Sequence, residues 1–289
     1  METALQVLVS GVLTGAEYAL AAVGMTLIFG VGRVLNLAHG AFLALGAYIA
    51  YQSTVLGLPA VAGAVPAAAA GALLGAAVER VTVRPLRSQP LTAAVVLLGL
   101  AILAEQGFSA AWGTSSHSVP LRLPTLLIGR LVLSMEQLIA AGVVVALFGM
   151  VAGYLWTRPG LALRAAAADA EIAQLAGVNV PRAQTATFGV ACGMAAVAGA
   201  FLSPLLTLSP TMGRSPLFLS LAMVAIGGPG RVWGTIVAGI GVGLASTAVE
   251  FYLAPPWSSV LALVLLIAAV VSRADGALGR MRSWRRSYS

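Results

Sequence analysis

The stretch "YALAAVGMTLIFGVGRVLNLAHGAFLALGAYIA" (residues 18–50) places Asn36 and His39 between two long apolar runs. A helix needs about 20 apolar residues to cross the hydrocarbon core of a bilayer. Glycines at positions 30, 32 and 40 interrupt the region between the runs. Lipid cannot satisfy the backbone groups that such a break frees, so the break must face protein or water. The stretch therefore predicts two membrane helices joined by a break inside the protein.

The composition extends this prediction to the whole chain. Of the 289 residues, 60% are hydrophobic and only 9% are charged. A soluble domain usually carries about 25% charged residues. So few charges could not cover a water-soluble surface of this size. We therefore expect an all-α, polytopic integral membrane bundle with glycine-broken helices.

Apolar runs predict about eight or nine transmembrane segments. The seventh is short and could be re-entrant or tilted, so eight crossings remain an alternative. With the N-terminus outside and nine crossings, thirteen of the sixteen basic residues lie on the inner side, as the positive-inside rule favours. The segments are 5–30, 37–57, 60–79, 91–111, 136–156, 184–207, 216–228, 233–253 and 257–272.

No low-complexity linker divides the chain, so residues 1–289 are expected to form one domain. A periplasmic loop is predicted at about 112–135 and a cytoplasmic loop at about 158–182. Small residues four apart share one helix face and allow close backbone approach in lipid. Five glycine pairs with this spacing are expected to pack the bundle: Gly11/Gly15, Gly71/Gly75, Gly149/Gly153, Gly189/Gly193 and Gly239/Gly243.

Several polar residues within the apolar runs are candidates for a translocation path. Asn36 and His39 would line the path, or would only tie off backbone groups at the break. Glu17, and Glu105 with its neighbour Gln106, are further candidates because carboxylates inside a membrane are costly. A structural ion pair or a water contact remains the alternative for each carboxylate. A second glycine-rich interruption, "GGPGRVWG" (227–234), is expected to pair with the first.

The residue types present exclude several kinds of chemistry. The chain has no lysine, so a Walker P-loop of the form GxxxxGK[ST] is impossible and ATP is not bound here in that way. Cys192 is the only cysteine, which excludes an intramolecular disulfide. His39 and His117 fall on opposite sides of the predicted topology, so no metal site is expected. The arginines lie between apolar runs rather than on one face, so nucleic acid is not an expected partner.

The segment "RPGLALRAAAADAEIAQLAGVNVPR" (158–182) predicts a cytoplasmic helix. Its alanine-rich run favours a helix, and Gly177 followed by Pro181 would end it. The few, mixed charges argue against lipid as its main partner. We expect a helix that docks on another protein; the alternative is an ordinary connecting helix.

Three stretches together resemble one family, the permease subunits of bacterial branched-chain amino-acid ABC transporters. They are the N-L-A-H-G block within 18–50, "VERVTVRPLRSQPL" (78–91), and the pair 160–182 with "AIGGPGRVWGTIVAG" (225–239). The resemblance covers nearly the whole chain and is closest to the shorter of the two paired permease types. One departure is Glu105, where the family often carries glutamine.

The resemblance implies a subunit of the bacterial inner membrane that is not itself an enzyme. Its implied partners are a second homologous permease, two cytoplasmic ABC ATPase subunits, a periplasmic substrate-binding protein and membrane lipid. ATP and Mg would bind in the ATPases, so no cofactor is expected in this chain. The residues implied to couple to the ATPase are Arg164, Asp169, Glu171, Ile172, Leu175, Gly177 and Arg182.

Other functions remain open on the sequence alone. Relatives of the same fold carry urea or short amides, so the solute is not fixed by the fold. An ion-coupled secondary transporter would use Glu17 or Glu105 as its coupling carboxylate. A purely scaffolding subunit would tolerate apolar replacement of Asn36 and His39. ATP dependence of uptake distinguishes these classes.

Overall fold

The structure is a computed structural model that describes residues 2–32, 34–119, 124–128, 131–253, 257, 260–261, 263–269 and 271. Within these residues the fold is helical except for one short hairpin. The elements are α1 (Glu2–Gly32), α2 (His39–Val55), η1 (Ala60–Gly63), α3 (Ala64–Val78), η2 (Glu79–Val83), α4 (Pro90–Trp112), β1 (Thr125–Ile128), β2 (Leu131–Ser134), α5 (Met135–Trp156), α6 (Arg158–Ala168), α7 (Ala170–Leu175), α8 (Val180–Leu202), α9 (Arg214–Gly227) and α10 (Val232–Tyr252).

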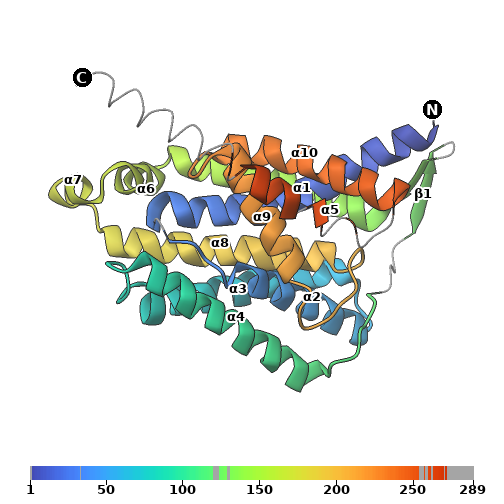
Figure 1. The fold of residues 1–289 in the computed structure, drawn as a ribbon, viewed down its shortest axis with the longest axis horizontal. Helices are drawn as coiled ribbons and strands as arrows, with labels where there is room; N and C mark the ends of the chain where they lie inside the picture. Colours follow the sequence, from blue (N-terminus) through green and yellow to red (C-terminus); the bar gives the residue numbers. More distant parts are fainter. Residues whose placement is uncertain are drawn as a thin grey trace.

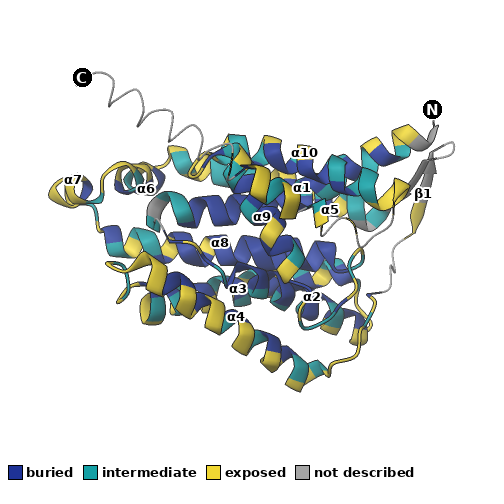
Figure 2. Cartoon of the chain, in the orientation of Figure 1, coloured by how far each residue is buried: buried dark blue, intermediate teal, exposed yellow. Residues whose placement is uncertain are grey.

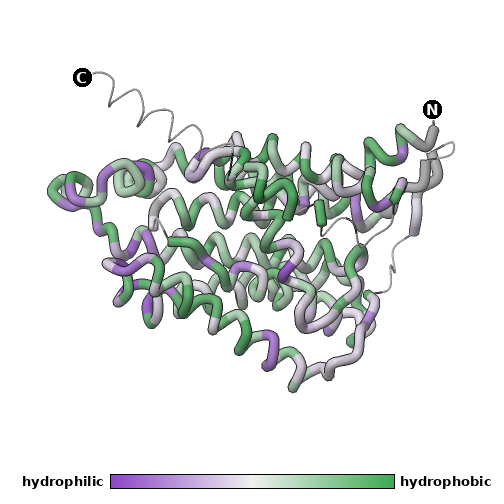
Figure 3. Tube along the Cα trace, viewed as in Figure 1, coloured by the Kyte–Doolittle hydropathy of each residue, from purple (hydrophilic) through white to green (hydrophobic). Residues whose placement is uncertain are grey.

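Helices α1 and α8 form the centre of the bundle. Helix α10 packs along α1, while α2 and α3 pack against α8. Figure 2 shows α8 buried along most of its length and α4 exposed along its outer side. Figure 3 shows hydrophobic residues along the bundle helices and hydrophilic ones gathered at the end that carries α6 and α7. The apolar side chains on the outer helices indicate that lipid, rather than water, surrounds the bundle.

Four of the five predicted glycine pairs lie at helix contacts. A Cβ at Gly243 in α10 would lie 2.1 Å from the Cα of Gly15 in α1, so only glycine allows this approach. The pairs in α3 and α8 meet in the same way, with Gly75 against Cys192. The expectation is wrong for the fifth pair. A Cβ added at Gly149 or Gly153 in α5 would have no neighbouring atom within 4 Å. Within the described chain they pack against nothing.

Six described helical segments are long and apolar enough to cross a membrane. Two predicted spans are shorter than that, because α2 has 17 residues and α9 has 14. The ninth predicted span (257–272) lies partly outside the described residues. The count of eight or nine crossings is therefore not confirmed by helix length alone.

The two ends of the bundle differ. One end carries α6 and α7, and the other carries the hairpin of β1 and β2 (Figure 1). The strands pair antiparallel, with Thr125 opposite Ser134 and Ile128 opposite Leu131. They lie within the predicted loop 112–135. Several arginines used to predict the orientation lie outside the described residues: Arg33, Arg122, Arg130, Arg273, Arg280, Arg282, Arg285 and Arg286.

Candidate functional site

The predicted break between the first two spans is present. Helix α1 ends at Gly32 and α2 begins only at His39. Asn36 lies between them and is fully buried. Its Oδ1 accepts a hydrogen bond from the Ala38 backbone N–H at 3.1 Å, and its Nδ2 lies 3.8 Å from Cys192 Sγ in α8. The side chain therefore satisfies the broken backbone and fixes it to α8.

His39 joins the start of α2 to the middle of α1. Its Nε2 donates to the Ala21 carbonyl at 2.8 Å. Ala21 lies eleven residues before the end of α1 at Gly32, which is about 16 Å at 1.5 Å per residue. Helix α2 therefore begins deep inside the bundle. The other ring nitrogen, Nδ1, is buried and has no hydrogen-bond partner in the described structure.

A second helix begins at the same depth. Helix α9 starts at Arg214, directly after Gly213. A Cβ at Gly40 would lie 2.3 Å from the Gly213 carbonyl oxygen, and one at Gly213 would lie 2.1 Å from the Gly40 oxygen. The N-terminal turns of α2 and α9 therefore touch inside the bundle. Helix N-termini carry unsatisfied N–H groups and partial positive charge, an arrangement found at the substrate sites of transporters.

The start of α2 thus meets a break other than the predicted glycine-rich stretch 227–234. That stretch forms the turn between α9 and α10, with positive φ at Gly228 and Gly230. It does approach the first break, since a Cβ at Gly30 would lie 3.1 Å from the Gly230 Cα. The interruption that meets α2 is residues 203–213, which precede α9. The predicted spans leave a gap at 208–215, and Pro204, Pro210 and Gly213 are typical of a break, but no local pattern indicated that this gap meets α2.

An ion pair lies beside the two helix starts. Arg214 binds Glu105 of α4 through two contacts, Nε to Oε1 at 2.8 Å and Nη2 to Oε2 at 2.6 Å. Glu105 lies seven residues before the end of α4 at Trp112, about 10 Å along the helix. The Glu105 side chain is 11% exposed, whereas that of Arg214 is 61% exposed. The neighbouring Gln106 is exposed.

Arg214 is therefore a functional candidate that the sequence reasoning missed. The pairing joins residues 109 positions apart, so no local pattern indicated it. A guanidinium is costly in contact with lipid. The exposed side of Arg214 is therefore a candidate contact with water or another protein chain.

Glu17 lies on α1 and is 1% exposed. Its Oε2 has no hydrogen-bond partner in the described part of the chain. The structure does not bring Glu17 together with Asn36, His39 or Glu105 through any contact described here. Its role in a path stays a prediction.

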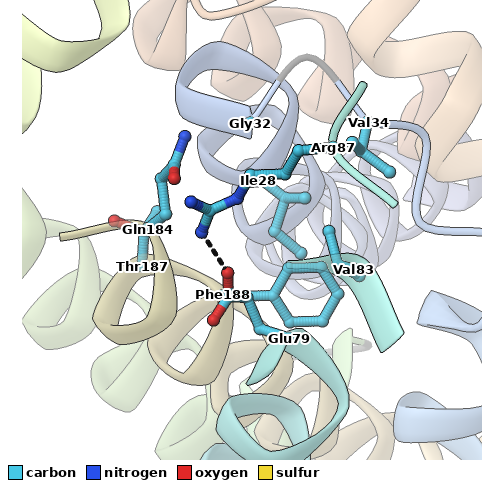
Figure 4. A pocket seen from close by; sticks show the side chains of 9 residues that line it. All are labelled: Ile28, Gly32, Val34, Glu79, Val83, Arg87, Gln184, Thr187 and Phe188. Atoms are coloured by element: carbon cyan, nitrogen blue, oxygen red, sulfur yellow. Dashed lines mark hydrogen bonds and ion pairs between the residues drawn. The ribbon is translucent and has the colours of Figure 1, made fainter. Parts of the chain in front are cut away.

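A second ion pair lies at the end of the bundle that carries α6 and α7. Glu79, the first residue of η2, is 1% exposed and binds Arg87 of the connection between η2 and α4. Thr185 of α8 donates to the other Glu79 oxygen. Figure 4 shows the Arg87 guanidinium pointing toward Glu79 across a cavity of about 20 Å³, which also borders Ile28 of α1. These contacts fix the α3–α4 connection to α8.

The segment 158–182 departs from the predicted single helix. It forms two helices, α6 and α7, because Asp169 adopts an extended conformation with φ −151° and ψ 111°. Asp169 Oδ1 then accepts from the backbone N–H groups of Glu171 at 2.9 Å and Ile172 at 3.0 Å, and so caps α7. An aspartate at this position favours a new helix start over continuation.

The ends of this segment follow the sequence more closely. Gly177, with φ +84°, ends α7 as expected. Pro181 does not end a helix but lies in the first turn of α8, where a missing N–H costs nothing. Asn179 caps α8 by accepting from the Arg182 N–H at 3.1 Å. Arg164 lies over the Trp156 ring, 5.4 Å from its centre.

Two large apolar side chains of α7, those of Ile172 and Leu175, are exposed in the described chain. Ile172 is 65% exposed and Leu175 is 89% exposed. Ala173 packs with Ala166 and Val180 on the opposite side and holds α7 to the bundle. Among the described residues, no three His, Cys, Asp or Glu side chains lie together as a metal site would require.

Comparisons with known proteins agree with this membrane architecture. The family model described as "Branched-chain amino acid transport system / permease component" matches residues 7–270. The high-affinity branched-chain amino acid transport permease LivH of Escherichia coli K12 is 29% identical over 96% of both chains. BraD of Pseudomonas aeruginosa is also 29% identical over 96% of both chains. A probable LivH of Methanocaldococcus jannaschii is 25% identical over 90% of this chain and 88% of its own.

No solved structure matches the chain. The family match nevertheless spans all of the helices that form the candidate site, from α1 to α10. This chain belongs to the family of permease components of branched-chain amino acid transport systems.

Proposed function

We propose that this chain is the permease subunit of an ATP-driven importer that carries branched-chain amino acids across the bacterial cytoplasmic membrane. The observation that carries this proposal is the family match over residues 7–270. The named relatives are permeases of branched-chain amino acid transport and align over nearly their full length. Those names give no support to urea, short amides or an ion-coupled mechanism.

The importer would contain a second homologous permease, two cytoplasmic ABC ATPases and a periplasmic binding protein. ATP and Mg would bind in the ATPase subunits, because this chain has no lysine with which to build a Walker P-loop. The division of roles leaves this subunit two tasks. It would form part of the translocation path, and it would receive the motion that ATP drives.

The translocation path would run along the face that carries Arg214, Glu105 and Gln106. The exposed Arg214 guanidinium supports this assignment, because a charged group is costly in contact with lipid. A free amino acid carries one positive and one negative charge, and the Arg214–Glu105 pair offers one partner for each. Asn36 and His39 would act just behind this face by holding the start of α2.

The membrane topology would include eight or nine crossings in one domain of residues 1–289. Helices α2 and α9 would each span part of the bilayer from their internal starts, and 257–272 would add the last segment. The end that carries α6 and α7 would be cytoplasmic, following the positive-inside rule. The described arginines assigned to that side are Arg80, Arg84, Arg87, Arg158, Arg164, Arg182 and Arg231.

Helices α6 and α7 would form the contact with the ATPase. Exposed Ile172 and Leu175 offer an apolar ridge for a groove in that partner. Arg164, Asp169 and Glu171 add charge beside the ridge. The Gly177 turn and Arg182 would connect its motion directly to α8, which lies at the centre of the bundle.

Uptake of leucine into proteoliposomes that contain the whole importer tests the proposed function. We expect uptake only with ATP inside the vesicles and binding protein outside. Uptake driven by an ion gradient in the absence of ATP would contradict the proposal. It would favour the alternative in which Glu17 or Glu105 couples transport to ions.

The coupling assignment has its own test. The double variant Asp169→Arg/Glu171→Arg should lose the co-purifying ATPase while the permease itself is produced at normal yield. The variant Arg231→Gln, which changes an exposed arginine between α9 and α10, serves as the matched control and should retain the ATPase. Retention of the ATPase by the double variant would reject the contact.

A further inference from the structure

A groove at the proposed cytoplasmic end of α3 and α8 combines a cluster of arginines with small or apolar walls. Its volume is about 580 Å³. Three arginines, Arg80, Arg84 and Arg182, line its mouth. Its walls deeper in the bundle are small or apolar, and include Ala76, Ala186 and Val190. One part of the groove therefore suits an anion and the other suits a hydrocarbon chain.

The positive charge at the mouth is not neutralised locally. None of the residues that line the groove in the described chain is acidic. The carboxylate of Glu79, which directly follows α3, is buried and already paired with Arg87 and Thr185. Arg84 donates to Thr185 Oγ1 at 3.4 Å, which positions the guanidinium and leaves its other N–H groups available. All three arginines are exposed.

The groove runs along α3 and α8, with its arginines at one end and its small or apolar residues toward the other. Ala72 and Ala76 of α3 and Arg80 of η2, which continues α3, follow one another at four-residue steps, as do Val190, Ala186 and Arg182 on α8. Eight helical residues extend about 12 Å. The apolar wall therefore continues about 12 Å from the arginines toward the middle of the bilayer. An occupant must be anionic at the interface and apolar below it.

We propose that this groove binds an anionic phospholipid of the cytoplasmic leaflet. The guanidinium groups of Arg80, Arg84 and Arg182 hold the phosphate, since arginine suits phosphate oxygens in geometry and charge. One acyl chain lies along the wall formed by α3 and α8. Basic pockets between membrane helices on the cytoplasmic side bind anionic headgroups by this chemistry.

An acidic surface of the ATPase is the other anion near this end. Helix α7 projects beyond the ends of α3 and α8 (Figure 1), so a protein seated on α7 does not need to enter the groove. The apolar wall also has no use in a purely electrostatic protein contact. Both observations favour the lipid.

The test measures lipid binding by native mass spectrometry of the full-length chain, purified with its co-purifying subunits. The probes are phosphatidylglycerol and, as the zwitterionic comparison, phosphatidylcholine. The variant Arg80→Gln/Arg84→Gln should weaken phosphatidylglycerol binding by about five-fold per arginine. Phosphatidylcholine binding should change little. The charge-matched control Arg158→Gln/Arg231→Gln removes two exposed arginines outside the groove and should leave both lipids unaffected.

A second variant tests the apolar wall without changing charge. Ala186→Phe fills the groove beside α8 and should lower phosphatidylglycerol binding several-fold. Millimolar inorganic phosphate should not displace the lipid, because it gains nothing from the wall. Displacement by phosphate, with Ala186→Phe inert, would overturn the proposal in favour of a phosphate site.

Two further outcomes would also overturn it. An equal loss of phosphatidylglycerol binding in the control Arg158→Gln/Arg231→Gln would mean that binding depends on general surface charge and not on the groove. Loss of the ATPase in Arg80→Gln/Arg84→Gln, with unchanged lipid binding, would assign the groove to the ATPase instead. Lipid binding is measured without substrate, so these results do not depend on which solute the importer carries.

Discussion

The molecule contains two Arg–Glu pairs that use the same chemistry in different surroundings. In the Glu79–Arg87 pair the carboxylate is 2% exposed and the arginine 29% exposed. In the Glu105–Arg214 pair the carboxylate is 11% exposed and the arginine 61% exposed. The first pair has a third partner in Thr185 of α8. The second pair lies beside the internal starts of α2 and α9.

The difference indicates different roles for the two pairs. Pairing the buried Glu79 carboxylate with both Arg87 and Thr185 makes it a structural link between the α3–α4 connection and α8. Leaving the Arg214 guanidinium exposed keeps a charge available to a passing solute or a partner chain. A buried charge pair is costly to break because one uncompensated ion remains. The first pair should therefore control folding, and the second should control transport.

Breaking the inner pair should have the largest effect. Glu79→Ala leaves Arg87 without its carboxylate and removes the acceptor of Thr185. We expect a loss of about 3–5 kcal/mol in the free energy of unfolding. Membrane yield and thermal stability of the purified chain in detergent should fall sharply.

Glu79→Gln provides the control for this prediction. It retains an acceptor for Thr185 and Arg87 but removes the charge, so its yield should lie between wild type and Glu79→Ala. Normal stability of Glu79→Ala would show that the pair is not structural.

The sequence allowed much of the inner architecture to be predicted, for physical reasons. Long apolar runs determine membrane helices, and glycine with Asn36 and His39 marked the break before α2. The Asp169 break was missed because the alanine-rich run outweighed the tendency of one aspartate to cap a new helix. The 79–185 and 105–214 contacts were also missed. Pairs separated by 106 and 109 positions depend on how helices pack, which periodicity does not report.

Disrupting the outer pair should affect transport more than stability. Arg214→Ala removes two charge-assisted hydrogen bonds, and its site is already open to solvent or partner. We expect ATP-driven leucine uptake to fall by about ten-fold or more, while yield stays near wild type. Uptake into proteoliposomes and size-exclusion profiles measure the two effects.

The exchange variant Glu105→Arg/Arg214→Glu sharpens this test. It restores the pair with reversed polarity, so a structural role predicts recovery of uptake. A role in contacting the charged ends of the solute predicts that uptake stays low. Full recovery would therefore remove Arg214 from the path.

The His39 hydrogen bond to Ala21 should have an intermediate effect. His39→Ala releases the start of α2 and leaves a buried carbonyl that α1 can still satisfy partly. We expect the transport rate per molecule to fall by about two- to ten-fold, the range expected for one hydrogen bond. Asn36→Ala should behave similarly because Asn36 holds the same turn.

Quantitative immunoblotting alongside the uptake assay distinguishes a role of His39 in the translocation path from a purely structural role. A fall in uptake that exceeds the fall in protein amount supports a role in the path. Equal falls would mean that His39 and Asn36 only tie off the broken backbone.

The smallest effect is expected for Glu105→Gln. The glutamine oxygen can still accept from Arg214 Nε or Nη2, so one of two hydrogen bonds is kept and only the negative charge is lost. We expect uptake to change by less than about three-fold, since a neutral hydrogen bond replaces a charged one at a partly solvated site. Leucine competition with other amino acids measures any change in preference. A loss as large as that of Arg214→Ala would show that the carboxylate charge, rather than the position of Arg214, is what the outer pair contributes.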